Sequence, residues 1–216
     1  MVQDIFENKS VYDISPLISE KTAVFPGDVP FQRNIAMSME SGDHLTLSSI
    51  NTTVHIGAHT DAPNHYHAEG DAIHEVDLDA YMGLAQVIEL DLTPNERITP
   101  NHLEGIEVVA PRVLFKTNSF PNPNHWVNDF NSLTPELIEY LAAKKVKLVG
   151  IDTPSVDPAE AKELTTHHAI YKNNLRILEG IVLTRVSAGV YVLVALPLPL
   201  EGADASPVRA ILVGEK

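Results

Sequence analysis

Cysteine is absent from this sequence of 216 residues, and its absence excludes several kinds of chemistry at once. Disulfide bonds, thiolate metal ligands and cysteine nucleophiles are all ruled out, so a bound metal must be held by histidine and carboxylate side chains. Because no disulfide has to form, the chain is compatible with a reducing cytosol.

Basic residues are also scarce, with 15 Lys and Arg against 29 Asp and Glu and a formal net charge of −14. Nucleic acids and anionic lipid surfaces attract proteins through clustered Lys and Arg side chains. We therefore expect neither a nucleic-acid partner nor a membrane partner.

Long hydrophobic runs are missing as well. No stretch approaches the roughly 18 consecutive apolar residues of a membrane-spanning helix. Residues 1–7 lack the basic and apolar regions of a signal peptide. These absences predict a soluble, cytoplasmic protein.

The hydrophobic residues that are present, 44% of the chain, suffice for one sizeable core, so residues 1–216 are expected to form a single domain. Thr134 and Pro135 predict the start of an amphipathic helix that reaches residue 144 or 145, and a buried strand over 146–151 follows it. This succession indicates an α/β fold. Further strands are predicted at 11–18, 31–39, 45–54, 83–92, 112–117, 181–186, 189–196 and 207–213, with a short helix after Thr99 and another helix over 158–173.

Histidine is concentrated in residues 55–67, which read His-Ile-Gly-Ala-His-Thr-Asp-Ala-Pro-Asn-His-Tyr-His and hold four of the ten histidines. Imidazole and carboxylate groups suit zinc, manganese and similar divalent ions, and His55, His59 and Asp61 supply three such donors. The pattern indicates a metal site. A His-rich surface loop without an ion is the alternative.

The spacing of these donors predicts the local shape of the chain. In a straight strand, at about 3.3 Å per residue, His55 and His59 would lie roughly 13 Å apart, too far to share one ion. A helix would bring them together, but Gly57 and Pro63 disfavour a helix here. The segment must therefore bend, and Gly57 permits a tight turn.

The histidine-rich stretch belongs to a set of four motifs that span almost the whole chain. They are Asp13-Ile-Ser with Phe25-Pro-Gly-Asp, His55-x-Gly-x-His59-x-Asp61-x-Pro-x-His65, Gly150-Ile-Asp-x-Pro-Ser-Val-Asp157 with Glu163-Leu-x-x-His167-His168, and Ala195-Leu-Pro-Leu with Gly202-x-Asp-x-Ser-Pro-Val-Arg209-Ala. In these motifs the sequence resembles the bacterial kynurenine formamidases (arylformamidases) of the metal-dependent cyclase family. It departs at Ala58, where Thr is usual, and at Phe25, where Trp is common, which could loosen a hydrogen bond and reshape an aromatic wall.

The resemblance implies a swivelling β/β/α cyclase-like fold with a mixed sheet and few helices, a homodimer, and one or two divalent ions per subunit, zinc ahead of manganese. It implies that Asp61 bridges two ions, that His167 rather than His168 is a ligand, and that His65 stays off the metal. From the residues alone the histidine pair is ambiguous, and Glu179 would be a solvated side chain. The implied ligands are His55, His59, Asp61, His167 and Glu179.

The implied reaction is the hydrolysis of N-formyl-L-kynurenine to L-kynurenine and formate, a step of tryptophan degradation. A divalent ion lowers the pKa of a bound water from about 15.7 towards about 7. Imidazole titrates near neutral pH, so His65 could take a proton from that water and return it to the leaving nitrogen. Phe25 and Trp126 are candidate contacts to the flat ring, and Asp13, Asp152 and Asp157 could orient imidazoles or cap turns.

Two alternatives remain open. The same chemistry could act on another small amide, such as the cyclic amide of isatin. Alternatively, the protein could bind a metal without catalysis, although structural zinc sites usually use closed, cysteine-rich ligand sets.

Overall fold

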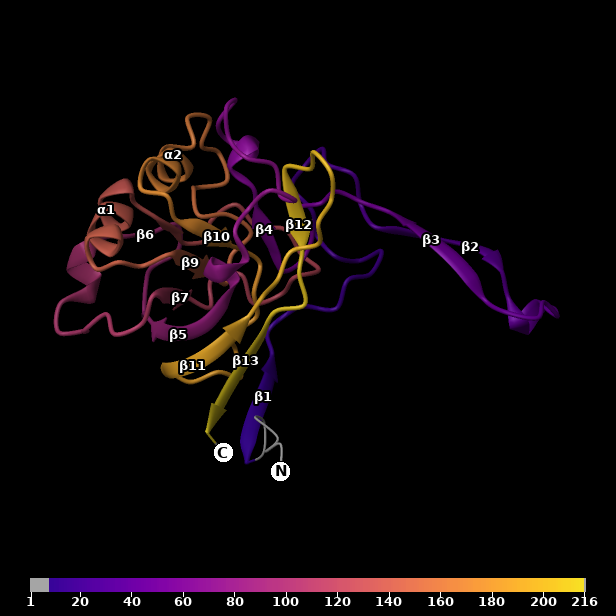
Figure 1. The fold of residues 1–216 in the computed structure, drawn as a ribbon, viewed down its shortest axis with the longest axis horizontal. Helices are drawn as coiled ribbons and strands as arrows, with labels where there is room; N and C mark the ends of the chain where they lie inside the picture. Colours follow the sequence, from indigo (N-terminus) through magenta and orange to yellow (C-terminus); the bar gives the residue numbers. More distant parts are fainter. Residues whose placement is uncertain (1–7, 216) are drawn as a thin grey trace.

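A mixed sheet of seven strands carries the fold in the computed structural model, which describes residues 8–215 (Figure 1). In spatial order the strands are β1 (Lys9–Asp13), β13 (Ile211–Glu215), β11 (Gly189–Val194), β5 (Met82–Glu89), β7 (Arg112–Lys116), β9 (Leu148–Ile151) and β10 (Arg176–Leu178). β5, β7, β9 and β10 run parallel, whereas β1, β13 and β11 join antiparallel on the other side of β5. The mixed sheet predicted from the sequence is confirmed. The prediction that residues 1–7 hold no signal peptide lies outside the described residues.

Three small sheets and two α-helices accompany the main sheet within residues 8–215. The small sheets pair β4 (His59–Asp61) with β12 (Ala205–Pro207), β2 (Gln32–Met37) with β3 (Leu47–Asn51), and β6 (Arg97–Ile98) with β8 (Ser132–Leu133). The helices are α1 (Pro135–Ala143) and α2 (Thr165–Lys172), and the short 3-10 turns are η1 (Met39–Ser41), η2 (Pro63–His65), η3 (Leu78–Tyr81) and η4 (Pro100–Leu103). Neither α-helix is long and apolar enough to cross a membrane.

Helix α1 begins where the sequence predicts. The Thr134 side chain accepts a hydrogen bond from the Leu137 amide, and Pro135 occupies the first turn, where no amide hydrogen is needed. Leu137, Ile138 and Leu141 share one buried face. With residues of α2, this face packs on one side of β7, β9 and β10 and forms the first of two hydrophobic clusters.

The second hydrophobic cluster lies on the opposite side of the sheet. Residues alternate between the two sides along each strand, so Leu148 contributes to this cluster and Val149 to the first. Ala58 and Ala62, which flank β4, belong to the second cluster. The segment that carries the histidine motif is therefore anchored directly on the sheet.

Four sequence predictions about elements need correction. The strand predicted over 207–213 is interrupted, because β12 ends at Pro207 and β13 begins only at Ile211. Residues 181–186 form turns and not a strand; Ile181 and Leu183 are buried by packing on the second cluster, so their apolar alternation reflects a covered loop. The helix predicted over 158–173 begins only at Thr165, because Leu164 has left-handed backbone geometry with φ 45°. The strand predicted over 11–18 ends at Asp13, whose side chain accepts from the Ser15 amide and turns the chain.

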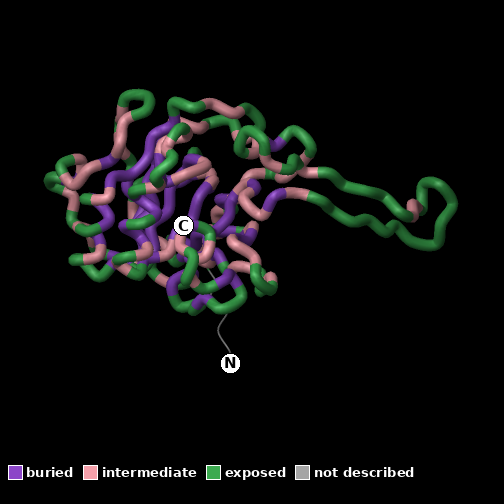
Figure 2. The backbone as a smooth tube through the Cα atoms, turned by 90° about the horizontal axis from the view of Figure 1, so that it is seen from above, coloured by how far each residue is buried: buried purple, intermediate pink, exposed green. Residues whose placement is uncertain are grey.

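The segment from β2 to β3 forms an arm that projects from the body (Figures 1 and 2). Every residue of β3 is exposed, as are all residues of β2 except Met37. At its base, the Thr53 amide donates to the Val29 carbonyl at 3.0 Å. The chain thus leaves the body after Val29, forms the arm and returns at Thr53, from where it leads to His55.

Candidate metal centre

The turn at Gly57 folds the two ends of the first motif together. Gly57 has φ +59°, and the ring centroids of His55 and His59 are 5.2 Å apart, so the predicted bend is confirmed. Both rings face Asp61, whose Oδ1 lies 3.0 Å from His55 Nδ1 and 3.6 Å from His59 Nε2. The structure therefore brings these three predicted donors to one point.

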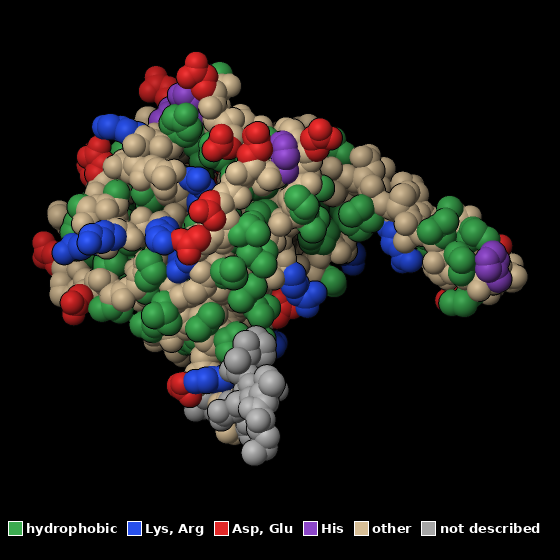
Figure 3. Space-filling model, in the orientation of Figure 1, with side chains coloured by type: hydrophobic (Ala, Val, Ile, Leu, Met, Phe, Trp, Pro, Cys, Tyr) green, Lys and Arg blue, Asp and Glu red, His purple; other side chains and the backbone are tan. Residues whose placement is uncertain are grey.

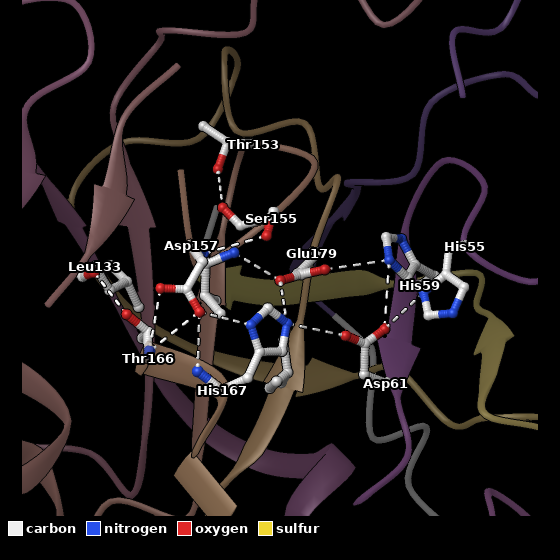
Figure 4. A network of polar contacts seen from close by, with 12 residues as sticks. His55, His59, Asp61, Leu133, Thr153, Ser155, Asp157, Thr166, His167 and Glu179 are labelled. Carbon is white, nitrogen blue, oxygen red and sulfur yellow. Dashed lines mark hydrogen bonds and ion pairs between the residues drawn. The ribbon is translucent and has the colours of Figure 1, made fainter. Parts of the chain in front are cut away.

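Glu179 reaches the same point from the end of β10. The His59 amide donates to the Glu179 carbonyl at 3.1 Å, and the Glu179 amide donates to the His59 carbonyl at 2.9 Å, so β4 and the end of β10 are joined. Glu179 Oε2 lies 3.2 Å from His59 Nε2 (Figure 4). Contrary to the reading from the residues alone, Glu179 is only 2% exposed.

His167 enters from the first turns of α2. Its Nε2 lies 3.4 Å from Asp61 Oδ2 and 3.8 Å from Glu179 Oε1, while its Nδ1 lies 2.8 Å from Asp157 Oδ2 (Figure 4). Asp157 also accepts the backbone amide of His167, which fixes the ring orientation. His168 is exposed, because the next residue on a helix points elsewhere.

Asp61 shows that the cluster fits a cation. The residue is fully buried, yet neither carboxylate oxygen has a hydrogen bond of good geometry. A buried carboxylate without such partners is costly unless positive charge compensates it. Asp61 belongs to two groups of donor atoms that lie within 4.8 Å of one another, one with His55 and His59 and one with His167 and Glu179. Nitrogen and oxygen donors in this arrangement suit one or two divalent ions.

The electrostatics of the cluster point the same way. Burial opposes the charged form of His55, but Asp61 and Asp204 outweigh it and raise the pKa of His55 to about 9. For His167, burial is likewise outweighed by Asp157, Asp61 and Glu179, and its pKa rises to about 10. The carboxylates therefore hold both imidazoles protonated near neutral pH, which means that they favour positive charge at the positions a metal would take.

A cavity of about 490 Å³ opens above the cluster. Its aromatic wall includes Phe25 and Trp126, whose ring centroids are 5.3 Å apart, and Phe120. Trp126 and Phe120 lie on the loop between β7 and β8. The volume lies within the range of small-molecule sites. Phe25 thus lines the cavity.

His65 lies beside the cluster at the end of η2. Its ring centroid is 4.3 Å from that of His55 and 6.1 Å from that of His167, and its side chain is 31% exposed. Asp204 Oδ2 lies 3.4 Å from His65 Nδ1 and 3.0 Å from His55 Nε2. Sequence reasoning assigned no role to Asp204, although it lies in the fourth motif.

The three candidate orienting aspartates separate into different roles. Only Asp157 meets an imidazole, that of His167. Asp152 accepts hydrogen bonds from the Thr117 and Asn118 amides, and Asp13 pairs with Arg209. Asp152 therefore fixes the start of the loop after β7, and Asp13 fixes the end of β1.

The fold and the cluster define a class: a mixed α/β protein whose buried imidazole and carboxylate groups converge on a site suited to divalent metal, under a cavity sized for a small molecule. Comparison with known proteins identifies the family within that class. The Cyclase family model matches residues 12–158. Kynurenine formamidases from Bordetella petrii and Bordetella pertussis are 44% and 43% identical over 206 and 205 residues, which cover 94% of this chain and 98% of each relative. The chain belongs to the Cyclase family, and its resemblance to bacterial kynurenine formamidases is confirmed.

Solved structures confirm the cyclase-like fold. A structure described as a predicted metal-dependent hydrolase from Bacillus stearothermophilus is 30% identical, with a TM-score of 0.81 over 95% of this chain and 98% of that chain. Isatin hydrolase A from Labrenzia aggregata gives a TM-score of 0.84 over 97% of this chain and 95% of that chain, at 19% identity. At such identity the second likeness establishes the fold alone.

Proposed function

We propose that this protein is a metal-dependent amidohydrolase that converts N-formyl-L-kynurenine to L-kynurenine and formate, a step of tryptophan degradation. The observation that carries the chemistry is the buried cluster of three imidazoles and two carboxylates, with His65 at its edge. The substrate assignment is supported by kynurenine formamidase relatives that are 44% identical over 94% of the chain.

His55, His59, Asp61, His167 and Glu179 would hold the metal, with Asp61 between two ion positions. Zinc is the first choice and manganese the second, because this ligand set accepts both. When bound, the ion would supply an activated water and polarise the formamide carbonyl. The chain's own contribution is to bury these donors and to fix their geometry.

His65 is the proposed general base and acid. It lies next to the ligand His55 and outside both groups around Asp61, in a separate group of donor atoms with His55 and Asp204. We assign His65 to proton transfer rather than to metal binding. It would take a proton from the attacking water and deliver it to the aniline nitrogen as the carbon–nitrogen bond breaks. An aryl amine leaves more readily than an alkyl amine, which suits this substrate.

The cavity offers an aromatic slot for the substrate ring between Phe25 and Trp126. Polar groups for the amino-acid end include Asp28 and Ser155, and an acidic side chain suits the α-ammonium group. No Lys or Arg lines this cavity among the described residues. A divalent ion would therefore be the main positive charge available to the substrate.

Formate release tests the proposal. Protein loaded with zinc or with manganese, its metal content measured by elemental analysis, should release formate from N-formylkynurenine, and isatin should be hydrolysed more slowly in a parallel assay. No formate with either metal would refute the assignment. Faster turnover of isatin would favour the cyclic amide as substrate.

We further propose that the protein is a homodimer in the cytoplasm. The arm supports self-association, since Ile35 and Ile50 are 57% and 65% exposed although an isolated two-stranded hairpin is at best marginally stable in water. A second apolar surface is formed by exposed residues of β1, β11 and β5. The cytoplasmic location is supported by the lack of cysteine, since folding requires no oxidising compartment.

A further inference from the structure

We propose that Asp204 is a positioning residue that fixes the orientation and tautomer of His65. This inference rests on the proposed function, because it concerns the group that would move protons in that reaction. Asp204 is a member of neither group around Asp61, but it contacts His55, which is, and together with His55 and His65 it forms a further group of donor atoms. Its influence is exerted through these two histidines.

One carboxylate oxygen of Asp204 faces two rings. Oδ2 lies 3.0 Å from His55 Nε2 and 3.4 Å from His65 Nδ1, and the centroids of the two rings are 4.3 Å apart. Because an ionised carboxylate only accepts hydrogen bonds, both nitrogens must carry hydrogen to bond with it. Asp204 therefore connects a proposed metal ligand to the proposed base.

The backbone holds Asp204 in place. The Ala62 amide donates to the Asp204 carbonyl at 2.8 Å, and in the next pair of the β4–β12 ladder Ala205 is opposite Asp61. On its other side, the Ala203 carbonyl accepts from the Ile73 amide at 2.9 Å. Asp204 is thus fixed relative to Asp61 by main-chain bonds that a side-chain substitution leaves intact.

The contact with Asp204 determines which ring nitrogen of His65 is free to accept a proton. In water a neutral histidine side chain prefers hydrogen on Nε2, whereas a carboxylate at Nδ1 favours hydrogen on Nδ1. With Nδ1 facing Asp204 at 3.4 Å, hydrogen is favoured on Nδ1, so Nε2 keeps its lone pair and can accept a proton. The hydrogen bond between His55 Nε2 and Asp204 leaves His55 Nδ1 free to face Asp61 and the metal position.

The test uses zinc-loaded protein and two substitutions, Asp204→Asn and Asp204→Ala. Glu201→Gln, which changes an exposed acidic residue on the preceding turn, is the matched control. Imidazole nitrogen NMR at a pH where His65 is neutral reports its tautomer independently of activity. Wild-type protein and the control should show hydrogen on Nδ1 of His65, and Asp204→Ala should lose this preference.

Kinetics complete the test. Assayed at saturating zinc, both Asp204 variants should keep KM but lose about tenfold to a hundredfold in kcat, the usual effect of removing a histidine-orienting carboxylate. The Asp204 side chain is 48% exposed, so added acetate should partly rescue Asp204→Ala. Hydrogen on Nε2 of His65 in wild-type protein, or recovery of the variants by excess zinc alone, would overturn the inference. Loss of formate release by wild-type protein would instead refute the proposed function and leave the tautomer measurement standing.

Discussion

At the scale of single residues, neighbouring histidines in one motif receive different environments. His59 is 2% exposed and lies between two carboxylates, whereas His65 is more open and lies outside both groups around Asp61. His67, two residues further on, stacks on Tyr171 with ring centroids 3.8 Å apart. Sequence proximity therefore does not make these side chains equivalent.

Substitution of the three histidines by alanine should separate these roles. His65→Ala should keep its zinc and lose about 10²-fold to 10⁴-fold in kcat, as expected for a general base and acid. His59→Ala should lose zinc and activity together, because a ligand is removed. His67→Ala is the control and should retain both. Elemental analysis and formate release measure the outcome, and full activity in His65→Ala would contradict the proposed mechanism.

The histidine pKa values predict how zinc binding depends on pH. His55 and His167, with pKa values of about 9 and 10, are protonated at pH 7 in the metal-free protein. Zinc must displace these protons, so its apparent affinity should rise between pH 7 and pH 9, by about tenfold per pH unit for each proton released. Competition with a chromophoric chelator at several pH values tests this expectation, and a constant affinity would contradict it.

At the scale of elements, the site depends on the junction between β4 and the end of β10. Gly180 follows Glu179 with φ +63°, and a Cβ atom there would lie 2.1 Å from the Gly57 carbonyl oxygen. The backbone at Gly180, next to the proposed ligand Glu179, therefore packs against the backbone at Gly57 at a distance that only glycine allows. Gly57 lies between the proposed ligands His55 and His59. This close approach holds the two halves of the site together.

Gly180→Ala should therefore separate the halves of the site. We expect weaker zinc binding, by at least tenfold, and a loss of stability greater than the roughly 1 kcal/mol expected for backbone strain alone. Gly202→Ala is the matched control, since Gly202 has φ +71° but nothing within 4 Å of an added Cβ atom. Zinc titration and urea unfolding of both variants decide the matter. Equal effects would show that the approach to Gly57 is unimportant.

At the scale of the whole molecule, two apolar surfaces lack a partner within residues 8–215. One is the arm, whose tip carries hydrophobic side chains (Figure 3). The other is a solvent-exposed face of the main sheet on β1, β13, β11 and β5, the strands that lie away from α1 and α2. Val192 lies opposite Leu84 on one side and Val213 on the other, and Val213 lies opposite Val11. In this row Val213 is buried, whereas Val11, Leu84 and Val192 are 55%, 53% and 41% exposed, and neighbouring exposed apolar side chains are typical of an interaction surface.

Self-association through these surfaces should respond to polar substitution. Wild-type protein should sediment as a dimer, and the double variant Ile35→Ser, Ile50→Ser should raise the dimer dissociation constant at least tenfold, because apolar burial is lost on both arms. Leu17→Ser, which changes an apolar residue that is 85% exposed outside both surfaces, is the control. Sedimentation velocity over a range of concentrations measures the constant. A wild-type monomer at every concentration would refute the homodimer.

The sequence by itself determined the chemical nature of the site. Without cysteine, only histidine and carboxylates could hold a metal, and the spacing of His55 and His59 required the turn that Gly57 makes. It also determined α1, because Thr134 and the buried positions that follow are local signals. Local signals failed at 181–186, where apolar residues are buried in a loop that packs on the sheet, and at 158–164, where the left-handed backbone of Leu164 delays the start of α2.

The tertiary structure decided which distant residues meet. Glu179 has no local feature that distinguishes it from a solvated glutamate, and it enters the site only because β10 lies beside β4. The orientation of α2 turns His167 inward and leaves His168 exposed. Asp204 reaches His65 only because β12 pairs with β4. The physical reason is the same in each case: contacts between residues far apart in the chain follow from sheet pairing and packing, which no local pattern encodes.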